Sequence, residues 1–145
     1  MTVIAWDGAT LAADRQTMLS GLKVRTQQKI FRLDDGRLFG GSGETALVRA
    51  MLNWFQEGED PAKYPQHKTS DSDWDPCVII AKDCLKLYER TPYPNILPPQ
   101  IFALGSGRDY ALAVMHLGHS AEKAVEVASH FDIGCGFGCT TLKLD

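Results

Sequence analysis

The chain has 145 residues, of which 44% are hydrophobic and 23% charged, proportions that fit one globular domain with a core of ordinary size. Its formal net charge of -3 argues against a surface built mainly to neutralise phosphates, so we expect no nucleic-acid partner. No apolar run approaches the roughly 20 residues that span a bilayer, and the N-terminus lacks the basic and apolar regions of a secretory signal. We therefore expect a single domain over residues 1–145, located in the cytoplasm, with no membrane partner.

The first predicted elements are two strand pairs, each joined by a short turn that contains glycine: residues 2–6 with 9–14, and residues 29–33 with 37–40. In the first pair the turn falls at Asp7 and Gly8, a dipeptide typical of tight hairpins. The sequence thus predicts four strands before any helix.

A helix is predicted after Gly43, because apolar residues recur there at the i, i+3, i+4 spacing of an amphipathic helix. Ser42 is the expected N-cap of this helix. Residues 58–75 are polar and contain two prolines, so we expect a long surface loop that contributes little to the core and contains at most a short helical turn.

The remainder is predicted to supply three strands, two helices and a closing strand, in the order 77–81, 85–88, 101–104, 110–117, 121–131 and 140–144. Ser120 is the expected N-cap of the second of these helices, and the proline-rich residues 92–99 are predicted to form a loop. This element order suits an α+β fold in which two packed antiparallel sheets lie between helix layers.

The threonine at position 2 is the first candidate for chemistry. A free N-terminal threonine combines a nucleophile and a base in one residue, because its hydroxyl attacks while its own α-amine accepts the proton. The reference pKa of an α-amine, about 7.7 to 8.0, leaves a useful neutral fraction near pH 7. Thr2 could therefore act as a nucleophile without a histidine.

Asp14 and Lys29 lie where two predicted strands could direct them toward Thr2. A cationic lysine beside Thr2 would lower the pKa values of the threonine hydroxyl and amine, and an adjacent carboxylate would hold that lysine in place. Acyl transfer also needs donors for the developing oxyanion, and the Gly-Gly-Ser-Gly run before the predicted helix offers backbone N–H groups. Gly43 is the expected donor.

These features together resemble the proteasome β/HslV peptidases, which belong to the N-terminal nucleophile hydrolases, in a short bacterial- or phage-like version. The resemblance spans nearly the whole chain and rests on Thr2, residues 13–16, Lys29 with residues 30–33, the helix entry at residues 40–46, and residues 104–107 with Tyr110 and Ala111. It implies a four-layer αββα sandwich and a threonine-type endopeptidase that needs no cofactor.

By the same resemblance, Thr2 is the nucleophile, Asp14 and Lys29 are its partners, Gly43 supplies the oxyanion hole, and Ser106 supports the amine. Asp132 occupies the place of a further acid, which would orient the amine or Ser106. Peptides or unfolded proteins are the implied substrates, a homo-oligomeric ring is the implied assembly, and an ATP-dependent unfoldase is a candidate partner.

The sequence also departs from the family pattern. Residues 58–75 replace a second long helix, which weakens the inference of ring contacts and of an unfoldase docking surface. The glycine-rich residues 134–138 lack the residues of the family's cation site, so we expect no bound metal. Side chains near Ser20 and Gly21, together with Ala50, are expected to line the substrate cleft and to leave room for an apolar residue.

Three alternatives stay open from the sequence. A chain that keeps Met1 has an amide in place of the Thr2 amine, and it would then be an inactive, ring-forming scaffold. An N-terminal nucleophile enzyme can also cleave small amides rather than peptides. The third alternative is a metal-binding module, although its candidate ligands lack standard zinc spacing: Cys135, Cys139, His116, His119 and His130.

We expect all four cysteines, which include Cys77 and Cys84, to be reduced thiols in or near the core.

Overall fold

The computed structural model describes residues 2–19, 21–24, 27–66 and 76–144. Its elements in chain order are β1 (Ile4–Trp6), β2 (Thr10–Asp14), β3 (Thr17–Leu19), β4 (Leu22–Val24), β5 (Ile30–Arg32), β6 (Leu38–Gly41), α1 (Thr45–Gln56), the 3-10 helix η1 (Pro61–Lys63), β7 (Cys77–Ile80), β8 (Leu85–Tyr88), β9 (Asn95–Leu97), β10 (Phe102–Leu104), α2 (Arg108–His116), α3 (Ala121–Phe131) and β11 (Cys139–Lys143).

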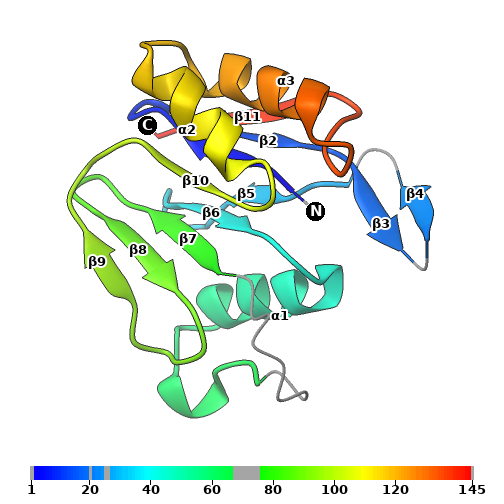
Figure 1. Ribbon diagram of the computed structural model, residues 1–145. Coiled ribbons are helices and arrows are strands. Elements are labelled where there is room, and N and C mark those ends of the chain that lie inside the picture. Colours follow the sequence, from blue (N-terminus) through cyan, green and yellow to red (C-terminus); the bar gives the residue numbers. More distant parts are fainter. Residues whose placement is uncertain (1, 20, 25–26, 67–75, 145) are drawn as a thin grey trace.

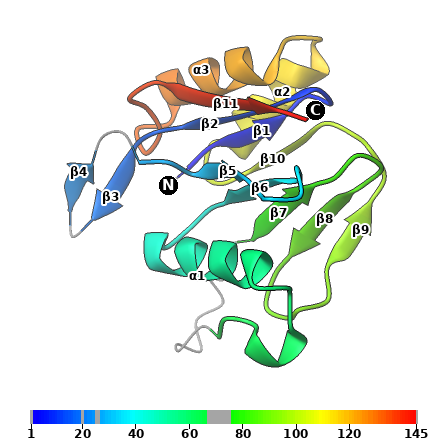
Figure 2. The same cartoon turned by 180° about the vertical axis from the view of Figure 1, so that it is seen from behind.

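Two antiparallel sheets face each other in the centre of the molecule. One has the strand order β10-β1-β2-β11 and the other has the order β5-β6-β7-β8-β9. Helices α2 and α3 cover the outer face of the first sheet, and α1 covers the outer face of the second (Figure 1). The same four layers are visible from behind (Figure 2). The predicted αββα sandwich of antiparallel sheets is therefore confirmed.

The strands read as nearly continuous apolar runs because both faces of each sheet are buried. Along β7, Val78 and Ile80 point into the core between the sheets, whereas Cys77 and Ile79 pack toward α1. This alternation follows from the two-residue period of a strand. Each sheet therefore needs a helix layer on its outer face.

Three cores result from these layers. The core between the sheets is formed by both sheets, the core under α2 and α3 is rich in alanine, and the core under α1 is aromatic. Within the aromatic core, the ring of Trp54 lies 4.9 Å from the rings of Phe55 and Tyr64. Tyr64 is buried, so the prediction that residues 58–75 carry little core is wrong at this position; residues 67–75 lie outside the described part.

The predicted turn at Asp7 and Gly8 is confirmed. The Asp7 carboxylate accepts hydrogen bonds from the N–H groups of Ala9 and Thr10, and Gly8 has a φ of +100°. Helix α3 has the predicted bounds, and Ser120 caps it by accepting a hydrogen bond from the Lys123 N–H. The turn at Asp7 and Gly8 and the cap at Ser120 were therefore predictable from the sequence.

Three expectations about elements are wrong. Strands β3 and β4 precede α1 in addition to the four predicted strands; they form a separate hairpin, and at three residues each they are too short for a clear strand pattern. Strand β9 lies in the proline-rich segment predicted as a loop, at the edge of a sheet where proline is tolerated. Ser42 does not cap α1: the N-cap residue is Glu44, without a side-chain cap, and the Ser42 hydroxyl donates to the Pro76 carbonyl instead.

Among the described residues, no helix has the length and apolar character needed to cross a membrane. Cys77 and Cys135 are buried, and Cys84 and Cys139 are partly buried, which agrees with the predicted core or near-core positions of the four thiols.

Candidate functional site

Thr2 is held at the start of β1 by contacts on both sides of its backbone. Its N–H donates to Ser106 Oγ at 3.3 Å, and its carbonyl oxygen accepts from the Gly107 N–H at 3.1 Å. The next N–H, that of Val3, donates to Asp14 Oδ1 at 3.1 Å. Thr2 is only 4% exposed, so its backbone position is fixed by these neighbours.

Gly105 allows the loop before α2 to approach Thr2 closely. A Cβ atom at position 105 would lie 2.1 Å from the Thr2 carbonyl oxygen, and the φ of Gly105 is +92°. Both features require glycine, because residues with a Cβ rarely adopt this φ and because the Thr2 carbonyl oxygen is a backbone atom that cannot easily move away. The glycines of the Gly-Ser-Gly motif therefore bring Ser106 next to the Thr2 amide.

Asp14 and Lys29 form a buried ion pair. Lys29 Nζ lies 2.7 Å from Asp14 Oδ1, and the two side chains are 5% and 0% exposed. The second carboxylate oxygen of Asp14 accepts from the N–H groups of Gln16 at 3.2 Å and Gly136 at 3.0 Å. A buried carboxylate is tolerable when it is paired and hydrogen-bonded in this way.

A hollow of about 20 Å³, called here the smaller hollow, joins Lys29 to Thr2. It is lined by Thr2, Thr17, Gln27, Gln28, Lys29, Gly41, Gly43, Thr45 and Val48. Gly21 and Ala50 do not line this hollow, and the expectation that they line the substrate cleft stays a prediction. Ser20, the third expected lining residue, lies outside the described part of the chain.

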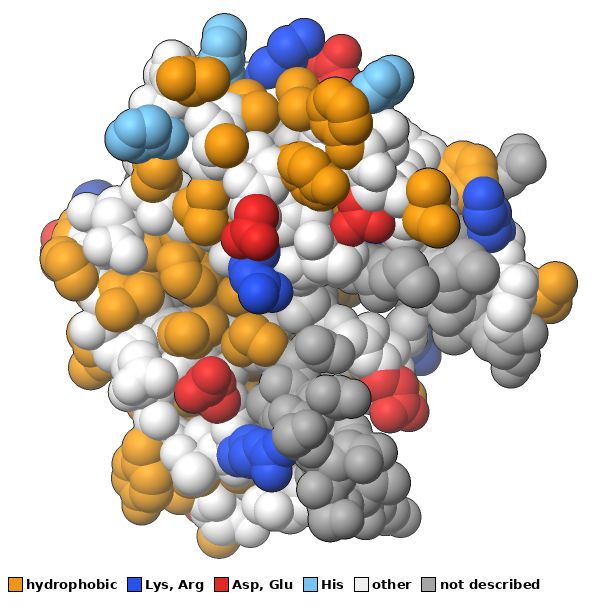
Figure 3. All heavy atoms as spheres, viewed as in Figure 1, with side chains coloured by type: hydrophobic (Ala, Val, Ile, Leu, Met, Phe, Trp, Pro, Cys, Tyr) orange, Lys and Arg blue, Asp and Glu red, His pale blue; other side chains and the backbone are white. Residues whose placement is uncertain are grey.

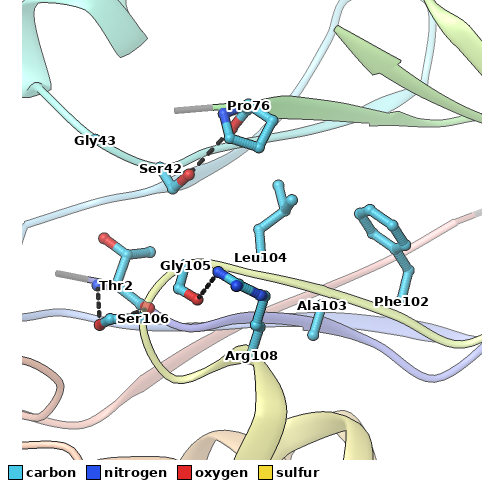
Figure 4. Close-up of a pocket in the computed structure, with 10 residues that line it drawn as sticks. All are labelled: Thr2, Ser42, Gly43, Pro76, Phe102, Ala103, Leu104, Gly105, Ser106 and Arg108. Carbon is cyan, nitrogen blue, oxygen red and sulfur yellow. Dashed lines mark hydrogen bonds between the residues drawn. The ribbon is translucent and has the colours of Figure 1, made fainter. Parts of the chain in front are cut away.

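A second space beside Thr2 is a cavity of about 480 Å³, called here the larger cavity (Figure 4). Its lining residues come from the start of β1, the entry to α1, strand β10 and the loop before α2: Thr2, Ser42, Gly43, Pro76, Phe102, Ala103, Leu104, Gly105, Ser106 and Arg108. This volume falls within the range of about 300 to 1,000 Å³ that is typical of ligand sites.

Gly43 lines both spaces together with Thr2. It has a φ of +99° and lies two residues before α1 begins. Ser42, immediately before it, is anchored because its N–H and its hydroxyl both donate to the Pro76 carbonyl, at 3.4 and 3.1 Å. The backbone at Gly43 is therefore fixed beside Thr2.

Asp132 reaches the site through Ser106. Burial works to raise the pKa of the Asp132 carboxyl, but hydrogen bonds from the Ser106 hydroxyl, the Gly134 N–H and the Cys135 thiol outweigh burial and lower that pKa below its ordinary value. Asp132 is consequently an anion at neutral pH, and its charge lies beside the serine that contacts the Thr2 N–H.

Cys135 is the thiol nearest to this network, with its Sγ 3.9 Å from Ser106 Oγ. Burial raises the pKa of Cys135 to about 12, and the charges of Asp14 and Asp132 act in the same direction. The reactive form of a cysteine is the thiolate. Cys135 is therefore a neutral packing group near neutral pH.

The six residues predicted for the site fall in one region. Thr2, Ser106 and Asp132 form one connected set, Asp14 and Lys29 form a second set that joins the first at the Val3 N–H, and Gly43 shares both spaces with Thr2.

Sequence reasoning missed Gln16 and Gly136. The Gln16 amide donates to the Ile133 carbonyl at 2.9 Å, and the Arg15 N–H donates to the Gly136 carbonyl at 3.0 Å. These contacts tie the loop after α3 to Asp14. The sequence placed Gln16 in the motif at residues 13–16 and Gly136 in a glycine-rich run, but their contacts with Asp14 and its loop become visible only when the loop after α3 packs against β2.

The alternative metal-binding module gains no support from the geometry. His116, His119 and His130 are all exposed. Within residues 2–19, 21–24, 27–66 and 76–144, no three His, Cys, Asp or Glu side chains are grouped so that they could hold a metal ion.

Comparison with known proteins gives matches at the level of structure. No protein-family model matches the sequence, and no curated protein matches it. The structure is similar to that of BPH from Thiobacillus denitrificans in complex with epoxomicin, with a TM-score of 0.73, 18% identity and 100% of both chains covered. It is also similar to a second BPH structure from that organism, with a TM-score of 0.68, 17% identity and coverage of 99% of this chain and 98% of the other.

A third similar structure is the eukaryotic HslV from Trypanosoma brucei, with a TM-score of 0.66, 18% identity and 97% of both chains covered. Coverage this complete means that the whole layered arrangement is shared. The chain therefore has the fold of HslV-type, proteasome-like N-terminal nucleophile hydrolases.

Proposed function

We propose that this chain is a threonine-type endopeptidase in which Thr2, made N-terminal by removal of Met1, attacks the peptide bond. One observation carries the proposal: Lys29 of the buried Asp14–Lys29 pair lines the smaller hollow with Thr2, and Asp14 holds the N–H that follows Thr2. A buried ion pair is costly to maintain and is a weak source of stability. Its place beside Thr2, whose backbone is held by Ser106 and Gly107, supports a chemical role.

The reaction would proceed in two balanced halves. The Thr2 Oγ forms a bond to the substrate carbonyl carbon while its proton passes to the Thr2 α-amine. The tetrahedral intermediate collapses as the C–N bond breaks, and the α-ammonium gives its proton to the leaving nitrogen. Water then attacks the ester carbonyl carbon while the same amine takes its proton; the bond from that carbon to Thr2 Oγ breaks, the α-ammonium returns the proton to Oγ, and the acid product leaves.

The neighbouring groups would assist through charge and position. The Lys29 cation lowers the pKa values of the Thr2 hydroxyl and amine, and Asp14 keeps that cation in place. The Gly43 N–H would donate to the oxyanion that forms on the substrate carbonyl. Ser106, hydrogen-bonded to Asp132, would orient the amine, since it already accepts from the Thr2 N–H.

Peptides or unfolded proteins are the proposed substrates, since the fold is that of HslV and BPH and the BPH structure holds epoxomicin.

A homo-oligomeric ring is the proposed assembly, in which the site would face an enclosed chamber. Apolar side chains gather over the side of the molecule that carries β8, β9 and β10 (Figure 3), where Tyr93 and Ile96 are 74% and 66% exposed. Such a surface supports contact between copies. An ATP-dependent unfoldase is a further proposed partner.

The decisive experiment compares one protein before and after its Thr2 amine is freed. The chain is produced with a removable N-terminal extension, and turnover of a fluorogenic peptide is measured before and after the extension is cleaved, with intact mass confirming the terminus. We expect turnover only after cleavage, loss of at least about 1,000-fold in Thr2→Ala, and partial retention in Thr2→Ser. Equal turnover before and after cleavage, or full activity of Thr2→Ala, would refute the proposal.

Measurements on the same protein also distinguish the proposed peptidase from the two alternatives, an inactive scaffold and a small-amide amidase. A native preparation that retains Met1 and assembles into rings without turnover would indicate the inactive scaffold. Thr2-dependent turnover confined to small amides would indicate an amidase. Addition of epoxomicin offers an independent probe, because we expect it to bind the freed protein and to suppress peptide turnover.

A further inference from the structure

The two spaces beside Thr2 differ in the groups that line them, and this difference assigns the two halves of a substrate. Ser106, which contacts the Thr2 backbone nitrogen, lines the larger cavity and is absent from the lining of the smaller hollow. Lys29 lines only the smaller hollow. The amine and the lysine therefore approach Thr2 from different sides.

Chemistry then decides which half of the peptide occupies which space. The α-ammonium must protonate the leaving nitrogen, so the leaving half of the substrate has to lie on the side of the amine. That side is the larger cavity. The acyl half, whose carbonyl carbon bonds to Thr2, extends along the smaller hollow.

The larger cavity combines an apolar wall with one cation. Its wall includes Pro76, Phe102 and Leu104, and among the described residues that line it Arg108 alone has a charged side chain. The guanidinium lies on the cavity side of the loop, where Nη1 donates to the Gly105 carbonyl at 3.4 Å (Figure 4). A planar guanidinium can bind a carboxylate through two parallel hydrogen bonds.

We propose that the larger cavity binds the leaving half of the peptide and that Arg108 selects a carboxylate in it. This inference rests on the proposed function. The carboxylate can belong to an acidic side chain near the cleaved bond or to the C-terminus of a short leaving peptide. In either case the aliphatic part of the leaving residue packs on Phe102 and Leu104 while the carboxylate meets the guanidinium.

The present partners of Arg108 do not compete strongly with such a substrate. Its ion-pair neighbour is the adjacent Asp109, at 3.8 Å, and the two side chains are 59% and 88% exposed. A pair this long and exposed contributes little to stability, so a substrate carboxylate can replace it at low cost. The hydrogen bond to the Gly105 carbonyl uses a single guanidinium nitrogen and leaves the others to bind the carboxylate.

The test uses the protein with a freed Thr2 and two pairs of quenched fluorescent peptides. In the first pair, end-blocked peptides differ only by Glu or Gln at the residue whose nitrogen leaves. In the second pair, peptides with a short neutral leaving half end in a free carboxylate or in a carboxamide. We expect kcat/KM to be about five- to tenfold higher for the carboxylate member of at least one pair, and the pair that responds identifies the source of the carboxylate.

Variants at position 108 assign the preference. Arg108→Gln should reduce the ratio within the responding pair to less than about twofold, and Arg108→Lys should keep part of it. Lys123→Gln, which removes an exposed cation from α3, is the matched control and should leave the ratio unchanged. The absence of a carboxylate preference in the wild type, or a preference that survives Arg108→Gln, would overturn the inference.

A substrate with a small neutral leaving group separates this inference from the proposed function. If turnover of that substrate depends on Thr2 but neither peptide pair shows a carboxylate preference, the role of Arg108 alone is overturned. Loss of Thr2 dependence would overturn both.

Discussion

Lys29 Nζ lies 2.7 Å from Asp14 Oδ1, and this contact joins the two central sheets. Asp14 ends β2 of one sheet, whereas Lys29 directly precedes β5 of the other. The pair is buried at the edge of the interface between the sheets, and Asp14 also holds the backbone on either side of the site. Its loss should therefore affect both stability and chemistry.

The first prediction concerns the cost of breaking this pair. Lys29→Met should destabilise the fold by about 3 to 5 kcal/mol, because it leaves a buried carboxylate without its cation, and it should also abolish turnover. Lys123→Met is the matched control, since Lys123 and Glu126 form an exposed pair, and it should change stability by less than about 0.5 kcal/mol. Urea denaturation checks both values; equal stability of the two variants would contradict the structural role of the pair.

The second prediction concerns the close approach of Gly105 to Thr2. Gly105→Ala places a Cβ atom 2.1 Å from the Thr2 carbonyl oxygen, so the loop carrying Ser106 must move. We expect a loss of stability of about 3 kcal/mol or more, and a loss of activity of at least about 100-fold.

Gly36→Ala is the control for this variant because Gly36 has the same φ of +92° but nothing within 4 Å of its added Cβ. It should cost only about 1 to 2 kcal/mol and leave activity intact. Thermal denaturation and peptide turnover measure the difference. Similar losses in the two variants would mean that φ alone, and not the contact with Thr2, requires glycine at position 105.

The third prediction concerns the pH dependence of activity. The lowered pKa of Asp132 keeps this carboxylate charged through the neutral range, so the acid limb of kcat/KM should report the Thr2 amine. A nearby anion favours the ammonium, and Asp132→Asn should therefore lower the pKa of the amine and move the acid limb to lower pH.

Maximal activity of Asp132→Asn should also fall, by about 10- to 100-fold, because Ser106 loses its carboxylate acceptor. Glu126→Gln, at an exposed position on α3, is the matched control and should leave the profile unchanged. An acid limb that stays in place in Asp132→Asn would argue against electrostatic contact between Asp132 and the amine.

The fourth prediction concerns Asp7, which ties the first hairpin to α3. Its carboxylate accepts from the N–H groups of Ala9, Thr10 and Ala121 at 2.8 to 2.9 Å. Burial works to raise the pKa of Asp7, but these hydrogen bonds outweigh burial and lower it. Because the folded state prefers the carboxylate, the stabilisation is fully present above the unfolded pKa of about 3.9 and is lost as the pH falls through the lower folded pKa.

Asp7→Asn should therefore destabilise the protein by about 1 to 2 kcal/mol at pH 7, and the difference from the wild type should shrink as the pH falls below about 4. Asp83→Asn, an exposed aspartate in the turn between β7 and β8, controls for the change in net charge and should have little effect. Urea denaturation at several pH values measures both. A pH-independent effect of Asp7→Asn would show that the carboxylate charge is not what stabilises the hairpin.

Local chemistry made much of the fold predictable. The turn at Asp7 and Gly8 and the start of α3 at Ser120 follow from residues that interact with their own neighbours. The apolar runs of β1, β2 and β7 predicted buried strands because a strand covered on both faces carries apolar side chains at successive positions. Ser42 was misjudged because a distant carbonyl, that of Pro76, takes its hydroxyl in place of the helix N-terminus.

The sequence by itself determined the identity and order of Thr2, Asp14, Lys29 and Ser106, and a chemistry that this set could perform. Only the tertiary structure decided that Asp14 and Lys29 meet between two sheets, that Gln16 and Gly136 complete the surroundings of the carboxylate, and that Arg108 lines a cavity beside Thr2. The physical reason is distance along the chain: turns and caps depend on a few adjacent residues, whereas the burial and pairing of charges depend on segments that packing alone brings together.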